Sequence, residues 1–267
     1  GILPHLNQWR PQLEQQASRV LGVPVKVDHI SVTTRNGVPT LTLHKLRLLD
    51  AEGRTALVLA HTTGTLSPRS LLAPHPGFEQ LRIDRADLDI RRDAQGRIFA
   101  AGVLLGTPGQ ADSPALDWLF SQRDIVLLGG TLRWTDAQRQ APPLALSEVQ
   151  AVLRNGLRSH DLRLDATPPA GWGERFTLTG RFNGPLLGRR GDVRQWRGEL
   201  HAQLPWADVA QLRQHVDLPF DVRQGRGAVR AWVQLDRGVA QGATVDLALR
   251  DMALRFRPTL APLVLQE

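Results

Sequence analysis

Apolar and polar residues alternate along much of the chain, most regularly in its second half. Successive side chains of a β-strand point to opposite faces, so a period of two indicates strands with one face covered and the other in water. We therefore expect the apolar positions of these strands to share one face of a sheet. The positions with the clearest alternation are Phe176, Leu178, Phe182, Leu200, Leu204, Val229, Val233, Leu247 and Leu249.

The alternation is less regular in the first half of the chain. It changes phase between Leu43 and Leu46, and again around Arg85. A shift of one residue in a period-two pattern indicates a β-bulge, which inserts one residue and bends the strand. The pattern predicts bulges near His44 and Arg85, and hence a curved sheet.

Short runs rich in Gly, Asn and Asp separate the alternating segments and are typical of hairpin turns between neighbouring strands. About a dozen strands at roughly 4.8 Å each would extend on the order of 55 Å, and open sheets of that width twist, curl or close. The pattern predicts a mainly β fold, a long curled antiparallel sheet whose apolar concave face forms a U-shaped groove. The clearest turns are residues 50–53, 93–96, 154–156 and 182–184.

A helical period precedes the strands. Leu13, Ala17 and Leu21 recur at helical spacing, Pro11 suits a first turn, and Gly22 suits the end of a helix. These residues predict a short amphipathic helix within residues 1–22, followed by the sheet over residues 23–267. The Pro- and Gly-rich stretch near residues 105–112 is the best candidate internal boundary.

A few short helices are expected to interrupt the sheet. Two begin with Ser followed by Pro, a favourable pair for a helix cap and first turn, at Ser67 and Ser113. A third begins at Pro205 and places Val209 and Leu212 on one side. Helices of this size could close an end of the sheet.

The overall charge does not predict nucleic-acid binding. The chain carries a formal charge of +7, with 33 basic residues of which only Lys26 and Lys45 are lysines. The arginines are spaced singly along the strands and do not form a block. This spacing is typical of a sheet face in contact with water. Nucleic-acid binding remains a further hypothesis, and it predicts a steep salt dependence of DNA affinity.

Candidate catalytic and metal-binding residues do not form a known site. Ser159, His160 and Asp161 are the residue types of a catalytic triad, but neighbours on a strand point to opposite faces. The acidic residues of 84–93 lack the spacing of a calcium loop, and Gly225-Arg226-Gly227 is interpreted as a turn. Cysteine is absent. We expect no enzymatic activity, no catalytic residues, no metal site and no cofactor.

Several segments together resemble a known family. Leu3–Pro11 leads into the helix, Leu21–Val25 and Asn36–Leu41 follow it, and Ser67–Leu72 and Pro205-Trp206 continue the pattern. In this order and spacing they resemble the first part of the YhdP proteins of Gram-negative bacteria. These belong to the AsmA-like group, which also contains TamB.

The resemblance implies a periplasmic segment of a lipid-transfer protein. It implies an inner-membrane anchor just upstream, and a long β groove that conducts phospholipid between the inner and outer membranes. The expected partners are phospholipid acyl chains, the inner membrane through that anchor, and outer-membrane or other envelope proteins, with no nucleic acid. The nine apolar residues of the second half would line the groove.

Two alternatives remain open. The same apolar residues could make a closed, dry core with helices packed over them. The protein could instead be an envelope assembly scaffold that assists outer-membrane protein biogenesis, because an edge strand offers unpaired backbone groups to a client strand.

Overall fold

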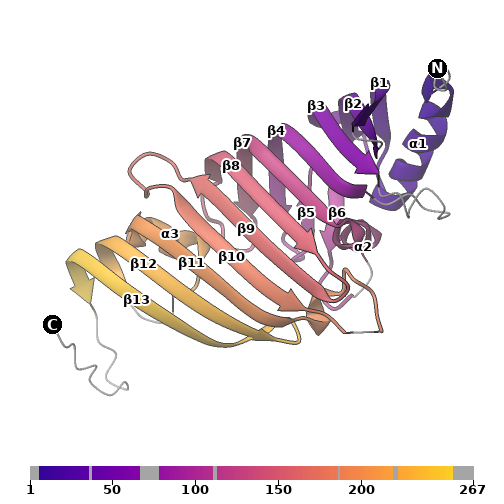
Figure 1. Ribbon diagram of the computed structural model, residues 1–267. Helices are drawn as coiled ribbons and strands as arrows, with labels where there is room; N and C mark the ends of the chain where they lie inside the picture. Colours follow the sequence, from indigo (N-terminus) through magenta and orange to yellow (C-terminus); the bar gives the residue numbers. More distant parts are fainter. Residues whose placement is uncertain are drawn as a thin grey trace.

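One large β-sheet dominates the computed structural model, which describes residues 6–35, 38–66, 78–110, 113–185, 187–218 and 222–254. Thirteen strands lie within these ranges, and all of them belong to this sheet. Figure 1 shows the strands side by side in a bent sheet, from β1 near helix α1 to β13 at the far end. The mainly β prediction is confirmed.

Most strands are longer than average, and the helices are short. The strands are β1 (Val25–Arg35), β2 (Val38–Leu49), β3 (Thr55–Leu66), β4 (Phe78–Arg92), β5 (Ile98–Ala100), β6 (Val103–Gly106), β7 (Asp124–Asp136), β8 (Leu144–Asn155), β9 (Ser159–Thr167), β10 (Phe176–Asn183), β11 (Arg197–Asp208), β12 (Val222–Asp236) and β13 (Val239–Leu254). The helices are α1 (Leu6–Leu21), α2 (Pro114–Ser121), α3 (Val209–His215) and the 3-10 turn η2 (Val193–Gln195).

The strand order follows the sequence, with one departure from antiparallel pairing. The main path runs β1-β2-β3-β4-β7-β8-β9-β10-β11-β12-β13, and β5 and β6 extend from β4. β4 and β7 pair in parallel, from Gln80 opposite Asp124 to Arg92 opposite Asp136. The expectation of a purely antiparallel sheet is therefore wrong at this pair. Residues 93–123 form the crossover that parallel neighbours require, carrying β5, β6 and α2.

The predicted phase changes are confirmed, but the inserted residues that would make them bulges are absent. The ladder continues one for one from His44–Leu46 to its partners on β3, and from Asp84–Ala86 to its partners on β7. Lys45, next to His44, and Arg85 adopt the left-handed backbone conformation, with φ of 53° and 54°. His44 lies opposite His61, and His61 lies opposite Asp84, so the irregularities stand at the same level of neighbouring strands. Because neighbouring strands change phase together, the apolar residues before and after these positions stay on one face.

Helix α1 covers the outer edge of β1. The Ser18 hydroxyl accepts a hydrogen bond from the Val25 N–H at 2.8 Å, and a Glu14 carboxylate oxygen accepts one from the Val27 N–H at 2.9 Å. These contacts satisfy backbone groups that an edge strand otherwise exposes. Helix α1 ends before Gly22, as predicted, but Pro11 lies inside it rather than in its first turn.

The short helices match the sequence in part. Ser113 caps α2 by accepting a hydrogen bond from the Leu116 N–H, which confirms that prediction. The helix expected from Pro205 begins only at Val209, because β11 continues through Pro205 to Asp208. Pro205 lies where the β11–β12 register shifts, a position that needs no ladder N–H. The helix expected at Ser67 lies outside the described residues.

Gly225-Arg226-Gly227 is not a turn but part of β12. Gly227 has φ of 154°, and a Cβ there would lie 2.0 Å from the Ala248 carbonyl oxygen of β13. The glycine therefore allows the close approach of the neighbouring strand, which is a common reason for a glycine inside a strand.

Candidate functional site

The sheet register places the nine predicted residues on one surface, called here the apolar face. Leu200 lies opposite Val233, and Leu204 lies opposite Val229. Val229 in turn lies opposite Leu247 on β13. Directly paired residues of antiparallel strands point to the same side. Phe176, Leu178 and Phe182 continue this face on β10, and Leu249 continues it on β13.

The face is covered at one end of the sheet and partly open at the other. Near β1 its residues are buried, with Val25 and Ile30 exposed by only 2% and 3%. Of the nine predicted residues, Val229 is buried and the other eight are half-buried. We call the part of the apolar face on β10–β13 its open section. The sequence left a groove and a closed core as alternatives, and the described residues contain a covered and a partly open portion.

Helix α1, the β5–β6 hairpin and α2 cover the first portion. Ala17 and Leu21 of α1, Val103 of β6 and Ala115 of α2 pack into the same cluster as Leu57 and other residues of the sheet. Figure 1 shows β5, β6 and α2 together at this half of the sheet. The cluster extends to Phe176, where the open section begins.

An aromatic cluster closes the apolar face where β9 and β11 begin. The His160 ring stacks on Trp196 with centroids 4.2 Å apart, and Phe120 of α2 meets Trp196 edge-on at 4.6 Å. Phe182 of β10 also stacks on Trp196, at 5.6 Å. These contacts connect α2 to the strands and cover this end of the apolar face.

His160 is held neutral inside this cluster. It is 2% exposed, and its Nδ1 lies 2.7 Å from the Asn155 Oδ1. Burial lowers the pKa of His160 to about 4, and the nearby Arg190 charge contributes to this shift. Ser159 and Asp161, in contrast, are exposed. The three neighbours therefore do not converge, in agreement with the prediction that they form no triad.

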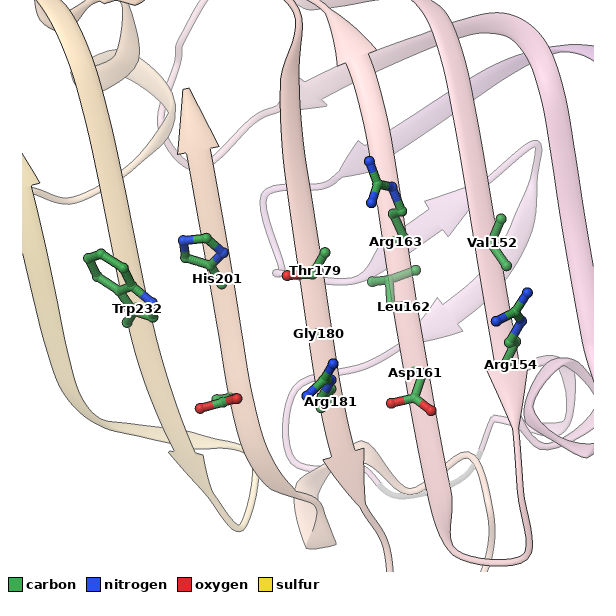
Figure 2. A pocket seen from close by; sticks show the side chains of 11 residues that line it. Val152, Arg154, Asp161, Leu162, Arg163, Thr179, Gly180, Arg181, His201 and Trp232 are labelled. Carbon is green, nitrogen blue, oxygen red and sulfur yellow. The ribbon is translucent and has the colours of Figure 1, made fainter. Parts of the chain in front are cut away.

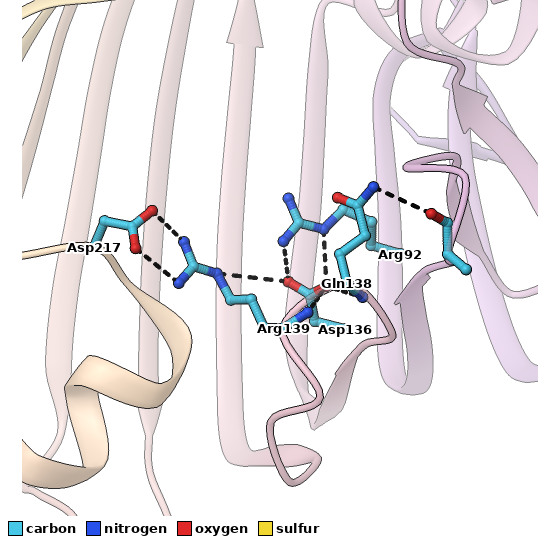
Figure 3. A network of polar contacts seen from close by, with 6 residues as sticks. Arg92, Asp136, Gln138, Arg139 and Asp217 are labelled. Carbon is cyan, nitrogen blue, oxygen red and sulfur yellow. Dashed lines mark hydrogen bonds and ion pairs between the residues drawn. The ribbon is translucent and has the colours of Figure 1, made fainter.

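A charged network lies at the opposite end of the strands (Figure 3). Asp136 of β7 accepts hydrogen bonds from Arg92 of β4, one of them at 2.9 Å, and from the backbone N–H groups of Gln138 and Arg139. Burial alone would raise the pKa of Asp136, but the Arg92 and backbone hydrogen bonds outweigh it and hold that pKa below its usual range. Arg139 then pairs with Asp217, which follows α3.

No pattern in the sequence pointed to this network. Arg139 and Asp217 are 78 residues apart, and neither belongs to a recognisable motif. Only the topology of the sheet brings the β7–β8 connection close to the segment after α3.

The opposite, polar face carries a hollow of about 850 Å³ across β8–β12. Figure 2 shows His201 and Trp232 on neighbouring strands, and their rings stack at 4.9 Å. Arg181 lies between Asp161 and Glu199 in the ladder. Charges that alternate in sign across strands stabilise a solvated sheet surface. None of the nine predicted residues lines this hollow.

Metal-binding groups and membrane-spanning helices are both absent from the described residues. Among them, no group of three or more His, Cys, Asp or Glu side chains is placed to hold a metal ion. In the same part of the chain, no helix combines the length and the apolar character needed to span a membrane.

Comparison with known proteins gives one match. The family model described as YhdP protein matches residues 1–267, the whole sequence. No curated protein matches the chain, and no solved structure does.

Proposed function

Since the chain belongs to the YhdP family, we propose that the open section of its apolar face holds the acyl chains of phospholipids. Family membership suggests an AsmA-like envelope protein of a Gram-negative bacterium. In this proposal the chain is a periplasmic segment of a lipid-transfer protein, anchored in the inner membrane, that conducts phospholipid towards the outer membrane.

The observation that carries the proposal is the continuous row of apolar side chains across β10–β13, which are half-buried except for the buried Val229. Moving an acyl chain of about 16 carbons through water costs on the order of 10 kcal/mol, at roughly 0.8 kcal/mol per methylene. Charge contacts to a headgroup, at about 1 kcal/mol each, could not offset that cost. A continuous apolar surface could.

The chain offers a clean test with neighbouring residues of β10. Leu178 lies on the apolar face and Thr179 lines the polar hollow. Because cysteine is absent, Leu178→Cys and Thr179→Cys each accept a single polarity-sensitive fluorophore. Adding phospholipid vesicles should shift the emission of the label at position 178 to shorter wavelength and leave position 179 unchanged. Equal shifts at both positions would contradict the proposal.

The open edge of the sheet favours a second candidate, an envelope assembly scaffold. Helix α1 satisfies backbone groups of the β1 edge, whereas within the described residues β13 pairs only with β12. A strand of 16 residues with a free edge can accept a client strand by β-augmentation. Binding of an unfolded outer-membrane protein diluted from urea, without lipid capture, would favour this candidate over lipid transfer.

A further inference from the structure

The charged network borders the apolar face directly. On β7, Leu132, Trp134 and Asp136 follow one another on the same side, and β4 presents Ile90 and Arg92 beside the last two. The apolar rows of both strands therefore end in a carboxylate and a guanidinium. Arg139 lies just beyond them, within reach of the Asp136 carboxylate at 3.8 Å.

Within the network, Asp217 is the carboxylate that a ligand can displace from Arg139. The Asp136 side chain is 2% exposed and already matched by Arg92, which donates two hydrogen bonds to it. Arg139 is 27% exposed, and Asp217 is 88% exposed. The network holds two positive and two negative charges. Displacing Asp217 would therefore leave one uncompensated positive charge, on Arg139.

The geometry of the Arg139–Asp217 pair suits exchange for a phosphate. Nη1 of Arg139 donates to one oxygen of Asp217 at 3.0 Å, and Nη2 donates to the other. A guanidinium that grips a carboxylate with two parallel hydrogen bonds can grip a phosphate in the same way. The charge and the hydrogen bonds of Arg139 also lower the pKa of Asp217, so the carboxylate is ionised at neutral pH.

A second feature at the same end of the strands is the packing of His215. His215 of α3 packs on Trp172, with ring centroids 5.6 Å apart. Both ring nitrogens of His215 are buried, and neither has a hydrogen-bond partner among the described residues. Buried polar atoms normally have a partner, so two in one ring require an explanation. Burial and the nearby Arg139 charge both lower the pKa of His215, so this ring lies close to Arg139.

We propose that Arg139 binds the phosphate of an anionic lipid headgroup while the acyl chains lie on the open section of the apolar face, and that Asp217 is the resident counterion displaced by this headgroup. The inference rests on the proposed function and adds a headgroup site to it. It also explains why a strongly exposed aspartate after α3 pairs with an arginine of the distant β7–β8 connection.

The test compares three ligands on the whole chain by titration calorimetry. They are dihexanoyl phosphatidylglycerol, dihexanoylglycerol and glycerol phosphate, which separate the complete lipid from its apolar part and from its phosphate. Arg139→Gln should weaken phosphatidylglycerol binding about tenfold, the usual worth of a charge-assisted pair, and leave dihexanoylglycerol unchanged. Asp217→Asn should strengthen phosphatidylglycerol binding, a gain that a damaged fold would not give.

The control is Arg154→Gln, which removes a charge from the polar face, where Arg154 is 71% exposed. Arg154→Gln should leave the affinities for all three ligands unchanged. A loss of phosphatidylglycerol affinity equal to that of Arg139→Gln would overturn the site at Arg139. Equal binding of glycerol phosphate and of the complete lipid would overturn the lipid assignment. Equal phosphatidylglycerol affinity in wild type and Arg139→Gln would overturn the headgroup inference alone. Failure of wild type to bind either short-chain lipid would instead contradict the proposed function.

Discussion

Gly198 lies directly opposite Phe182 in the β10–β11 ladder. A Cβ at Gly198 would lie 2.0 Å from the Arg181 carbonyl oxygen and 2.8 Å from the Phe182 Cα. The two strands therefore approach closely at the point where Phe182 stacks on Trp196. The absence of a side chain at Gly198 lets the aromatic cluster form at this end of the apolar face.

Gly198→Ala is expected to destabilise the fold by about 2 kcal/mol or more, because the new methyl group meets backbone of the neighbouring strand that cannot move without breaking the ladder. Urea unfolding would measure this loss. Gly242→Ala on β13 is the matched control, since a Cβ there meets no atom within 4 Å. Similar stability losses in both variants would contradict the close approach.

The left-handed conformation of Arg85 gives a prediction of the opposite sign. Arg85 holds a left-handed backbone conformation, which costs a residue with a Cβ about 1–2 kcal/mol. Glycine adopts it freely but loses more entropy on folding, so Arg85→Gly should be stabilising by about 0.5–1 kcal/mol. Arg82→Gly, in regular strand of the same β4, should be destabilising in the same thermal and urea unfolding experiments. Destabilisation by both would contradict the left-handed conformation at position 85.

Acid should weaken the fold through His160. Its pKa is about 4 in the folded protein and near 6.5 when unfolded. The unfolded chain therefore takes up a proton first, and this part of the stability is complete above about pH 6.5 and lost as the pH falls towards 4. The loss amounts to about 3 kcal/mol. His160→Gln should reduce the difference in unfolding free energy between pH 7 and pH 4.5 by about 2–3 kcal/mol.

An NMR titration checks the same point directly. The His160 ring signals should shift with a midpoint near pH 4 in the folded protein. A midpoint near 6.5 would show that the ring is hydrated, and would contradict its burial between Trp196 and Asn155.

The period-two pattern was enough to predict the sheet, its phase changes near His44 and Arg85, and the shared face of the nine apolar residues. Side-chain direction in a strand follows from local geometry alone, so residues such as Phe176 and Leu178 could be assigned to one side without knowing their neighbours. The phase change near Arg85 was visible in the same pattern, but the prediction of a bulge there was wrong, because a left-handed residue changes the phase without inserting a residue.

Strand partners and end contacts could not be predicted, because they depend on the path of the chain. The β4 pattern is the same whether β7 runs parallel or antiparallel to it, and the crossover of residues 93–123 decides the direction. His160 could equally have been an exposed residue of its strand, since Asn155 and Trp196 reach it only in the folded sheet. Gly227 carries no local sign that Ala248 lies against it.

Photo-crosslinking in the cell envelope tests the central claim most directly. Leu200 and Val233 lie opposite each other on the apolar face, and Gln203 and Gln234 are exposed on the polar face of the same two strands. A photoreactive amino acid placed at position 200 or 233 should capture phospholipid, identified by mass spectrometry, well above the yield at position 203 or 234. Equal phospholipid yields on the two faces would contradict the account.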